Sequence, residues 1–337
     1  MGNAAKVIQR ISQIESEIIF WKIRRKLFNT IAGLVRRILA PVEAFVIRRY
    51  ATEEAKYPPI FIIGAPRAGS TILYEYMTNY LDIMYINNFM CRFNKILYLA
   101  SVASKIIFRG GQHNCFDSEH GATNGWNSPS ECGGFWYRWF PRDKHFVDSD
   151  ELDNIQISQI REVVVAIINK HNKPILFKNM NCGQRLRIIK NIFPNALFIY
   201  CKRDPLFTAQ SIIESRERIH KNRQTWWSIM PREYDKLLKL DYCEQVVKQI
   251  YYIQKQIEKD ADFFEKKQFI EIWYEDFCKL PKSIIEDIRS FLSQNGVSTG
   301  YRAEVAETKI RLSQQRRIDK QTYNRLSKLV ESLDWGS

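Results

Sequence analysis

Residues 60–71 read Ile-Phe-Ile-Ile-Gly-Ala-Pro-Arg-Ala-Gly-Ser-Thr, a short apolar run followed by a turn with two glycines. The apolar run predicts a strand at 60–64 that is buried on both faces, because it shows no polar alternation. An amphipathic segment at 70–81 predicts a helix directly after the turn. A strand, turn and helix in this order bring backbone N–H groups and the positive end of a helix dipole to one point, which suits an anion.

The two glycines of this turn have a spacing known from nucleotide-binding loops. Gly64 and Gly69 match the P-loop pattern Gly-x-x-x-x-Gly, which normally continues with Lys and then Ser or Thr. Here Ser70 follows Gly69, so the lysine is missing. A guanidinium stands inside the loop instead, at Arg67, and its planar fork can hold two oxygens of an anion. The loop therefore predicts an anionic ligand that needs no metal ion.

A second marker lies at 194–205, Pro-Asn-Ala-Leu-Phe-Ile-Tyr-Cys-Lys-Arg-Asp-Pro, which predicts a buried strand that ends in charged residues. Arg203 stands at the carboxyl end of this strand, and Ser211 stands in the helix expected after Pro205. Ligands of open parallel sheets bind beyond the carboxyl ends of the strands. We therefore expect Arg203 and Ser211 to face the same crevice as the glycine loop.

Apolar runs and amphipathic segments alternate along most of the chain. Strands are predicted at 60–64, 174–178, 196–201 and 268–273, and helices near 70–81, 155–171, 184–193, 205–220, 241–265, 281–294 and 314–333. This alternation predicts a P-loop-like three-layer α/β fold, in which helices flank a central, mainly parallel sheet. We expect one α/β domain at 56–337 after a helical extension at 1–55, with residues 86–150 forming a lid and acceptor pocket.

Four blocks resemble sulfotransferases that use 3′-phosphoadenosine 5′-phosphosulfate (PAPS), and they extend over roughly residues 58–295. The blocks are the loop at 64–71, Pro-Ile-Leu-Phe-Lys-Asn at 174–179, Tyr-Cys-Lys-Arg-Asp-Pro-Leu-Phe-Thr-Ala-Gln-Ser at 200–211 and Ile-Trp-Tyr-Glu-Asp-Phe at 272–277. Segments 118–121 and 128–138 resemble a bacterial branch of this family. The resemblance implies transfer of a sulfuryl group from PAPS, as co-substrate, to an acceptor hydroxyl without a metal ion.

The resemblance also implies roles for residues at matching positions. Arg203 and Ser211 would bind the 3′-phosphate, and Lys178 would neutralise charge on the leaving oxygen. The 5′-phosphosulfate would be held by Arg67 and by the backbone of Ala68, Gly69, Ser70 and Thr71. A basic cluster near the C terminus would add contacts to the 3′-phosphate, chiefly Arg316 and Arg317, with Arg311 and Lys320 as further members.

Sulfuryl transfer also needs a base that takes the proton of the acceptor hydroxyl. Glu131 is the first choice, because Trp126, Phe135 and Trp136 in the same segment would give it an apolar surround, which helps a carboxylate to take up a proton near neutral pH. Glu119 and His120 are the alternatives, the latter because an imidazole titrates near neutrality without help. The pattern ranks Glu131 first and leaves these two residues, or a group that the sequence does not reveal, as alternatives.

The chain is strongly basic, with a formal net charge of +14. This charge favours an anionic donor, acidic acceptors or anionic lipid, and it is compatible with nucleic acid. Residues 1–50 mix apolar and basic side chains and are expected to form an amphipathic helical region. Such a region lies on a membrane surface, or packs on the domain or on a second copy in a homodimer. No stretch is apolar enough to span a bilayer and no signal-peptide core appears, so we expect a cytoplasmic protein, peripheral on the cytoplasmic membrane in the first case.

Three classes of function follow from these features. The first is a PAPS-dependent sulfotransferase whose acceptor hydroxyl belongs to a carbohydrate or a glycolipid rather than to a protein tyrosine, with no nucleic-acid partner. The second is a kinase-like phosphotransferase that uses MgATP, against which the missing loop lysine counts. The third is a membrane or nucleic-acid binding protein without catalysis. The seven cysteines are scattered without metal-ligand spacing, which predicts reduced thiols and no structural zinc.

Overall fold

The computed structural model describes residues 30, 32–51, 54–116, 118–119, 121–304 and 310–336. The chain divides into two compact units, residues 1–46 and residues 47–337. Residues 32–50 are helical, as predicted, and residues 1–29 of the expected helical region lie outside the described residues. The predicted domain boundary between residues 55 and 56 stays a prediction.

The helix of the first unit has one exposed apolar face. Leu34, Ile38, Val42 and Phe45 are 59%, 63%, 47% and 72% exposed. Residues at this spacing lie above one another on a helix, so the four side chains form a stripe. Among the described residues, no helix is long and apolar enough to cross a membrane.

The second unit is built on a five-stranded sheet in the order β2-β5-β1-β6-β7. The strands are β1 (Ile60–Gly64), β2 (Met84–Tyr85), β5 (Ile175–Lys178), β6 (Leu197–Lys202) and β7 (Phe269–Trp273). All neighbouring strands pair in parallel, which confirms the predicted sheet. Because β1 is central, the glycine loop opens at the middle of the edge where all the strands have their carboxyl ends.

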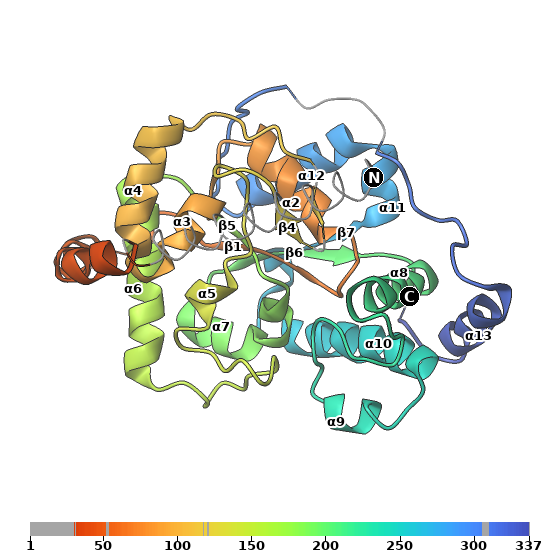
Figure 1. Cartoon of the computed structure of the whole chain (residues 1–337). Coiled ribbons are helices and arrows are strands. Elements are labelled where there is room, and N and C mark those ends of the chain that lie inside the picture. Colours follow the sequence, from red (N-terminus) through yellow and green to blue (C-terminus); the bar gives the residue numbers. More distant parts are fainter. Residues whose placement is uncertain are drawn as a thin grey trace, which may run out of the picture. The chain divides into compact units, whose positions relative to one another are not determined.

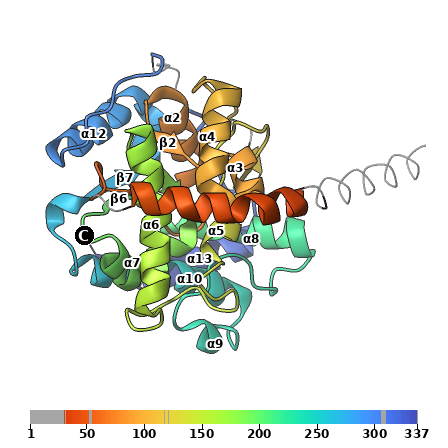
Figure 2. The same ribbon diagram turned by 90° about the vertical axis from the view of Figure 1, so that its left-hand side faces the viewer.

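Helices cover both faces of this sheet, so the predicted three-layer fold is confirmed (Figures 1 and 2). One face carries α2 (Ser70–Tyr80), α11 (Tyr274–Lys279) and α12 (Pro281–Gln294), and the other carries α7 (Leu186–Ile192) and α10 (Tyr242–Ala261). The remaining long helices are α6 (Asn154–His171), α8 (Pro205–His220) and α13 (Lys320–Glu331). The helix predicted at 314–333 is therefore wrong for its first six residues.

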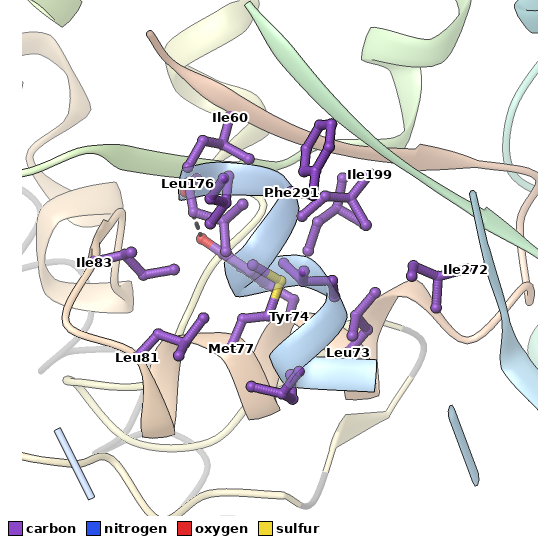
Figure 3. Packing of buried hydrophobic residues seen from close by; sticks show 14 of the residues in the cluster. Ile60, Leu73, Tyr74, Met77, Leu81, Ile83, Leu176, Ile199, Ile272 and Phe291 are labelled. Carbon is purple, nitrogen blue, oxygen red and sulfur yellow. Dashed lines mark hydrogen bonds between the residues drawn. The ribbon is translucent and has the colours of Figure 1, made fainter. Parts of the chain in front are cut away.

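The main apolar core lies between the sheet and the helices α2 and α12 (Figure 3). Ile60 and Ile62 point into this core, while Phe61 between them stacks on Phe177 and Phe198 on the opposite face. Both faces of β1 are therefore buried, which explains its unbroken apolar sequence. Each large apolar side chain buried in this way contributes roughly 1.5–3 kcal/mol to stability.

The stretch from 86 to 150 contains regular structure that the sequence did not reveal. It forms α3 (Asn88–Arg92), α4 (Leu97–Phe108), α5 (Gly133–Trp136) and a hairpin of β3 (Ser118–Glu119) and β4 (Ala122–Thr123). The twelve residues of α4 include apolar side chains on its exposed as well as its buried side, so no amphipathic stripe stands out in the sequence. The role of this stretch as a lid stays a prediction.

A buried histidine gives the fold a measurable pH dependence. His171, the last residue of α6, is 6% exposed and lies 2.8 Å from Ser101 Oγ through its Nε2 atom. Burial lowers the pKa of His171 to about 4, whereas an imidazole in the unfolded chain has a pKa of about 6.5. The stability that depends on the neutral ring is fully present above about pH 6.5 and is lost as the pH falls toward 4.

We expect the free energy of unfolding of the wild-type protein to fall between about pH 7 and about pH 5 by more than that of H171Q, because the variant lacks this titration. Urea unfolding at both pH values measures the difference. H220Q, which replaces an exposed histidine of α8, is the matched control and should behave as the wild type. The same pH dependence in H171Q and in the wild type would contradict the assignment.

Candidate active site

Both glycines of the loop between β1 and α2 are required by close packing. A Cβ atom on Gly64 would lie 2.4 Å from the carbonyl oxygen of Cys201 in β6. Gly69 has a φ of +84°, and a Cβ atom on it would lie 2.3 Å from the ring of Tyr274. Only glycine allows the backbone to approach its neighbours this closely.

The helix after the loop begins without compensation for its positive end. Ser70 starts α2 with no capping side chain, and the first turn contains no acidic residue. The first N–H groups of a helix have no partner within the helix and carry the positive end of its dipole. Gly69, Ser70 and Thr71 line a cavity, whereas Ala68 is buried and is not among its lining residues. This end of α2 can therefore donate hydrogen bonds to an anion.

Arg67, Arg203 and Ser211 come together beside the loop. Arg67 Nε donates a hydrogen bond to Ser211 Oγ at 2.8 Å, and Arg203 Nη1 donates to the carbonyl oxygen of Arg67 at 3.0 Å. Arg203 is 6% exposed, and its Nε has no hydrogen-bond partner among the described residues. The sequence assigned Arg67 to the phosphosulfate and the other two residues to the 3′-phosphate. The structure joins the three side chains at one place.

Two more guanidinium groups lie near Arg67. Arg218 of α8 and Arg317, in the segment before α13, both act on it electrostatically. Burial lowers the pKa of Arg67, and the positive charges of Arg203, Arg218 and Arg317 lower it further. The carboxylate of Glu214, which pairs with Arg317 at 2.7 Å, offsets part of this charge. We call Arg67, Arg203, Arg218 and Arg317 the arginine cluster.

The segment before α13 reaches the cluster because it is attached to α8. Gln210 Nε2 donates to the carbonyl oxygen of Gln315 at 2.9 Å, and its Oε1 accepts from the backbone N–H of Arg317 at 3.0 Å. Arg203 Nη2 also donates to the carbonyl oxygen of Ser313, at 2.6 Å. Arg316 is exposed, and no described contact connects its side chain to the cluster. The predicted phosphate contacts of Arg316 and Arg317 stay predictions.

A buried lysine and a carboxylate form the other half of the site. Lys178 ends β5, its side chain is 3% exposed, and its Nζ donates to Thr71 Oγ1 at 2.9 Å and to Glu131 Oε1. A Cβ atom on Gly121 would lie 2.6 Å from Glu131 Oε1, so the glycine leaves room for the carboxylate. Three residues that the sequence placed in separate segments thus meet at the start of α2.

The surroundings of Glu131 differ from the expectation. Phe135 and Trp136 are buried in the core, where Trp136 packs against Phe61 and Phe177. The carboxylate instead pairs with an ammonium group. The argument for Glu131 from an apolar surround is therefore wrong, because Phe135 and Trp136 face the core rather than the site, and Trp126 is 54% exposed and lies against Phe89. The role of Glu131 as the base stays a prediction that rests on its position.

The two alternative bases are only partly described. His120 lies outside the described residues, as does the side chain of Glu119. The backbone of Glu119 pairs with Ala122 in the β3–β4 hairpin, and Ser118 and Gly121 of this hairpin line the cavity. The hairpin that carries both alternatives therefore borders the site, and their roles stay predictions.

One cavity of about 490 Å³ is lined by the loop with Arg67, by Arg203, and by Lys178 and Glu131. Ser211, Arg218 and Arg317 are not among its lining residues. Its walls also include residues to which the sequence gave no role, namely Tyr137, His145, Asn181 and Tyr274. His145 Nδ1 accepts a hydrogen bond from the backbone N–H of Met230 at 2.9 Å, and burial lowers the pKa of His145 to about 4. The ring is therefore neutral at pH 7 with its proton on Nε2, where it donates rather than accepts.

Some of these residues carried a signal in the sequence and others did not. Tyr274 follows β7 at the carboxyl edge of the sheet. Arg218 stands seven residues after Ser211 and so lies on the same face of α8. His145 lies in an irregular segment without a recognisable pattern. Among the described residues, no three His, Cys, Asp or Glu side chains gather where they could hold a metal ion.

A glycine loop at the centre of a parallel sheet, with an arginine cluster and a buried lysine beside it, is an arrangement typical of P-loop-like transferases. The model of the Sulfotransferase family matches residues 58–295. The chain therefore belongs to the sulfotransferase family, and the resemblance deduced from its motifs is confirmed.

Similar proteins come from bacteria. Omega-hydroxy-beta-dihydromenaquinone-9 sulfotransferase Stf3 from Mycobacterium bovis and from Mycobacterium tuberculosis is 22% identical over 254 residues, which are 70% of this chain and 62% of the relative. The match thus spans less than two thirds of the length of these relatives. Sulfotransferase STF9 from Mycobacterium avium has a TM-score of 0.48 at 12% identity, over 85% of this chain and 71% of that chain. A sulfotransferase from Alicyclobacillus acidocaldarius has a TM-score of 0.42 at 14% identity, over 81% and 96%.

The close approach of the loop to Tyr274 can be tested with an alanine. G69A would place a Cβ atom against the ring at a positive φ, so it should lower stability by both backbone strain and collision. G110A is the matched control, because Gly110 has a φ of +69° with no atom within 4 Å of the added Cβ. In urea unfolding, we expect G69A to lose at least about 1 kcal/mol more than G110A. Equal losses would mean that the ring moves aside without cost.

Proposed function

We propose that this sulfotransferase moves a sulfuryl group from PAPS to an acceptor hydroxyl. The observation that supports PAPS most strongly is the pairing of two anion-binding features, the uncapped start of α2 and the arginine cluster next to it. PAPS carries anionic groups at two places, a 3′-phosphate and a 5′-phosphosulfate, and requires two such features. A nucleoside triphosphate carries its charge at one end and would leave the cluster without a partner.

The residues present suit the two ends of this donor. Arg203, with an Nε that has no described partner, and Ser211 would bind the 3′-phosphate. The backbone N–H groups at 69–71 would bind the 5′-phosphosulfate. Arg67 would lie near both ends of PAPS, because its backbone is part of the glycine loop and its side chain contacts Ser211. Bound PAPS would supply the activated sulfuryl group, and the protein would supply position and charge.

Lys178 and Glu131 would then act on the two sides of the transferred group. Lys178 lies between Thr71 and Glu131, where its ammonium would neutralise charge on the leaving oxygen. One such group commonly contributes about 3–4 kcal/mol, or about 10²–10³ in rate. Glu131 would take the proton of the acceptor hydroxyl. Both roles require the ion pair to open, so that the lysine turns to the donor and releases the carboxylate.

The acceptor that we propose is a hydroxyl on a lipid, including the carbohydrate part of a glycolipid. Stf3 is named for the sulfation of a hydroxylated menaquinone, which is a lipid. The exposed apolar stripe of Leu34, Ile38, Val42 and Phe45 suits a peripheral contact with a membrane surface, where such an acceptor would be found. The enzyme would then work at the cytoplasmic face of the membrane.

Donor binding is tested by titration with the desulfated product, 3′-phosphoadenosine 5′-phosphate. We expect the wild type to bind it without magnesium and R203A to bind it about 10–100-fold more weakly, because a charge-assisted hydrogen bond is lost. R325A is the matched control, since Arg325 is an exposed arginine of α13 that pairs with Asp241. Unchanged affinity in R203A would contradict the contact, and binding of MgATP instead of this product would contradict the donor.

The base is tested by E131Q. We expect turnover, measured as transfer of radioactive sulfate from PAPS to a lipid extract, to fall about 10²–10⁴-fold while affinity for the desulfated product changes little. E331Q, in which an exposed carboxylate of α13 is replaced, is the control and should keep normal turnover. Near-normal turnover in E131Q would show that another group takes the proton.

A further inference from the structure

A second cavity, of about 240 Å³, lies beside the amino-terminal ends of β2 and β5. It is enclosed by residues of α3, α4 and α6, by β2 and the residues next to β2 and β5, and by Asn127 and Arg302. None of these residues lines the active-site cavity. It is therefore a separate place at which a ligand could bind.

The charge of this cavity is positive. Four basic side chains line it, Lys105, Arg109, Lys173 and Arg302, against the carboxylate of Asp82. Asp82 pairs with Lys173 and also lies 3.6 Å from Arg302. Among the described residues, Lys105 and Arg109 have no carboxylate partner. The helix dipole carries roughly half a negative charge at the carboxyl end of α4. It offsets only part of the positive charge of the basic side chains, so the cavity stays basic.

Neutral groups complete the cavity with hydrogen-bonding atoms. Asn87 Nδ2 donates to Ser104 Oγ at 2.7 Å and to Asn127 Oδ1 at 3.2 Å, and all three residues line the cavity. His171 lines it as well, and its pKa is lowered first by burial and then by Lys105 and other nearby lysines. The positive field thus extends into the cavity, which suits the oxygen atoms of a phosphate group.

Two exposed apolar side chains stand in the last turn of α4, at the same end of the helix as Lys105 and Arg109. Ile106 and Ile107, between Lys105 and Arg109 in the sequence, are 72% and 55% exposed at the end of α4, which lies at the periphery of the second unit (Figure 1). A membrane surface satisfies both kinds of group, because apolar side chains enter the boundary of the acyl chains while cations meet the phosphates. The charge of the cavity selects an anionic lipid.

We propose that Ile106, Ile107 and this basic cavity form a docking site for an anionic membrane, in which the cavity binds the phosphate of a lipid headgroup. We call it the headgroup site. It does not depend on the assignment of the donor or of the base, and it is distinct from the apolar stripe of the first unit. It would hold the second unit on the membrane through its own contacts.

Co-sedimentation of the full chain with vesicles tests the headgroup site. The vesicles are phosphatidylcholine alone or phosphatidylcholine with phosphatidylglycerol. A basic side chain near an anionic surface changes binding by roughly fivefold, so the double variant K105Q/R109Q should bind the anionic vesicles about 25-fold more weakly than the wild type. The control R325Q/K328Q removes the same charge from α13. We expect it to change binding much less.

A second pair of variants tests the apolar contact. I106S/I107S should also lose binding to anionic vesicles, whereas L280S, at a leucine that is 60% exposed on another helix end, should not. A far-UV circular dichroism spectrum like that of the wild type shows that each variant is folded. If both double variants bind vesicles as their controls do, the proposal is wrong and vesicle binding belongs to another surface, such as the first unit.

Titration with inorganic phosphate and with glycerol 3-phosphate separates a lipid from a soluble anion. The headgroup site predicts that K105Q/R109Q weakens binding of glycerol 3-phosphate and of vesicles together. Loss of phosphate binding with unchanged vesicle binding would identify a site for a free anion and overturn the proposed membrane contact.

Discussion

The repulsion within the arginine cluster is the constraint on which the site depends. Guanidinium groups brought together in a partly buried place lower the stability of the folded chain unless an anion joins them. The protein holds them there through backbone attachments, since Arg203 donates to the carbonyl oxygens of the loop and of Ser313, and Gln210 binds the segment that carries Arg317. An arrangement that is costly alone and favourable with a ligand is typical of a binding site.

The parallel sheet makes this arrangement possible. Its central strand leads into the glycine loop, and the neighbouring strands end in Lys178 and just before Arg203. Charges that are far apart in the sequence therefore meet at one edge. Donor binding and sulfuryl transfer would use different groups at this edge. The arginine cluster can hold the donor, while Lys178 and Glu131 lie at the start of α2 and are available for the reaction.

Much of the fold could be predicted because its strands are buried on both faces and its helices are periodic. The strands at 60–64, 175–178, 197–202 and 269–273 were found within one residue of their ends. The sequence does not predict α4 because exposed isoleucines obscure its periodicity. Residues 314–319, predicted as helix, are irregular, and Gln315 and Arg317 bind Gln210 of α8 instead. Neither the exposure of these isoleucines nor the contacts with α8 can be read from the local sequence.

The candidate site was predictable where a motif fixes a position on the fold, as for the loop and for Arg203. The candidate site was less predictable where it depends on contacts between side chains that are distant in the sequence. The ion pair of Lys178 with Glu131 joins segments 47 residues apart, and the contact of Arg67 with Ser211 joins segments 144 residues apart. The aromatic residues near Glu131 illustrate the limit, because composition shows that they are close in the chain but not which way they face.

A crystal structure with 3′-phosphoadenosine 5′-phosphate tests the central claim most directly. The account predicts the 3′-phosphate within hydrogen-bonding distance of Arg203 and Ser211, and the 5′-phosphate at the backbone N–H groups of residues 69–71. A nucleotide bound with its 3′-phosphate away from the arginine cluster, or with the glycine loop empty, would contradict it.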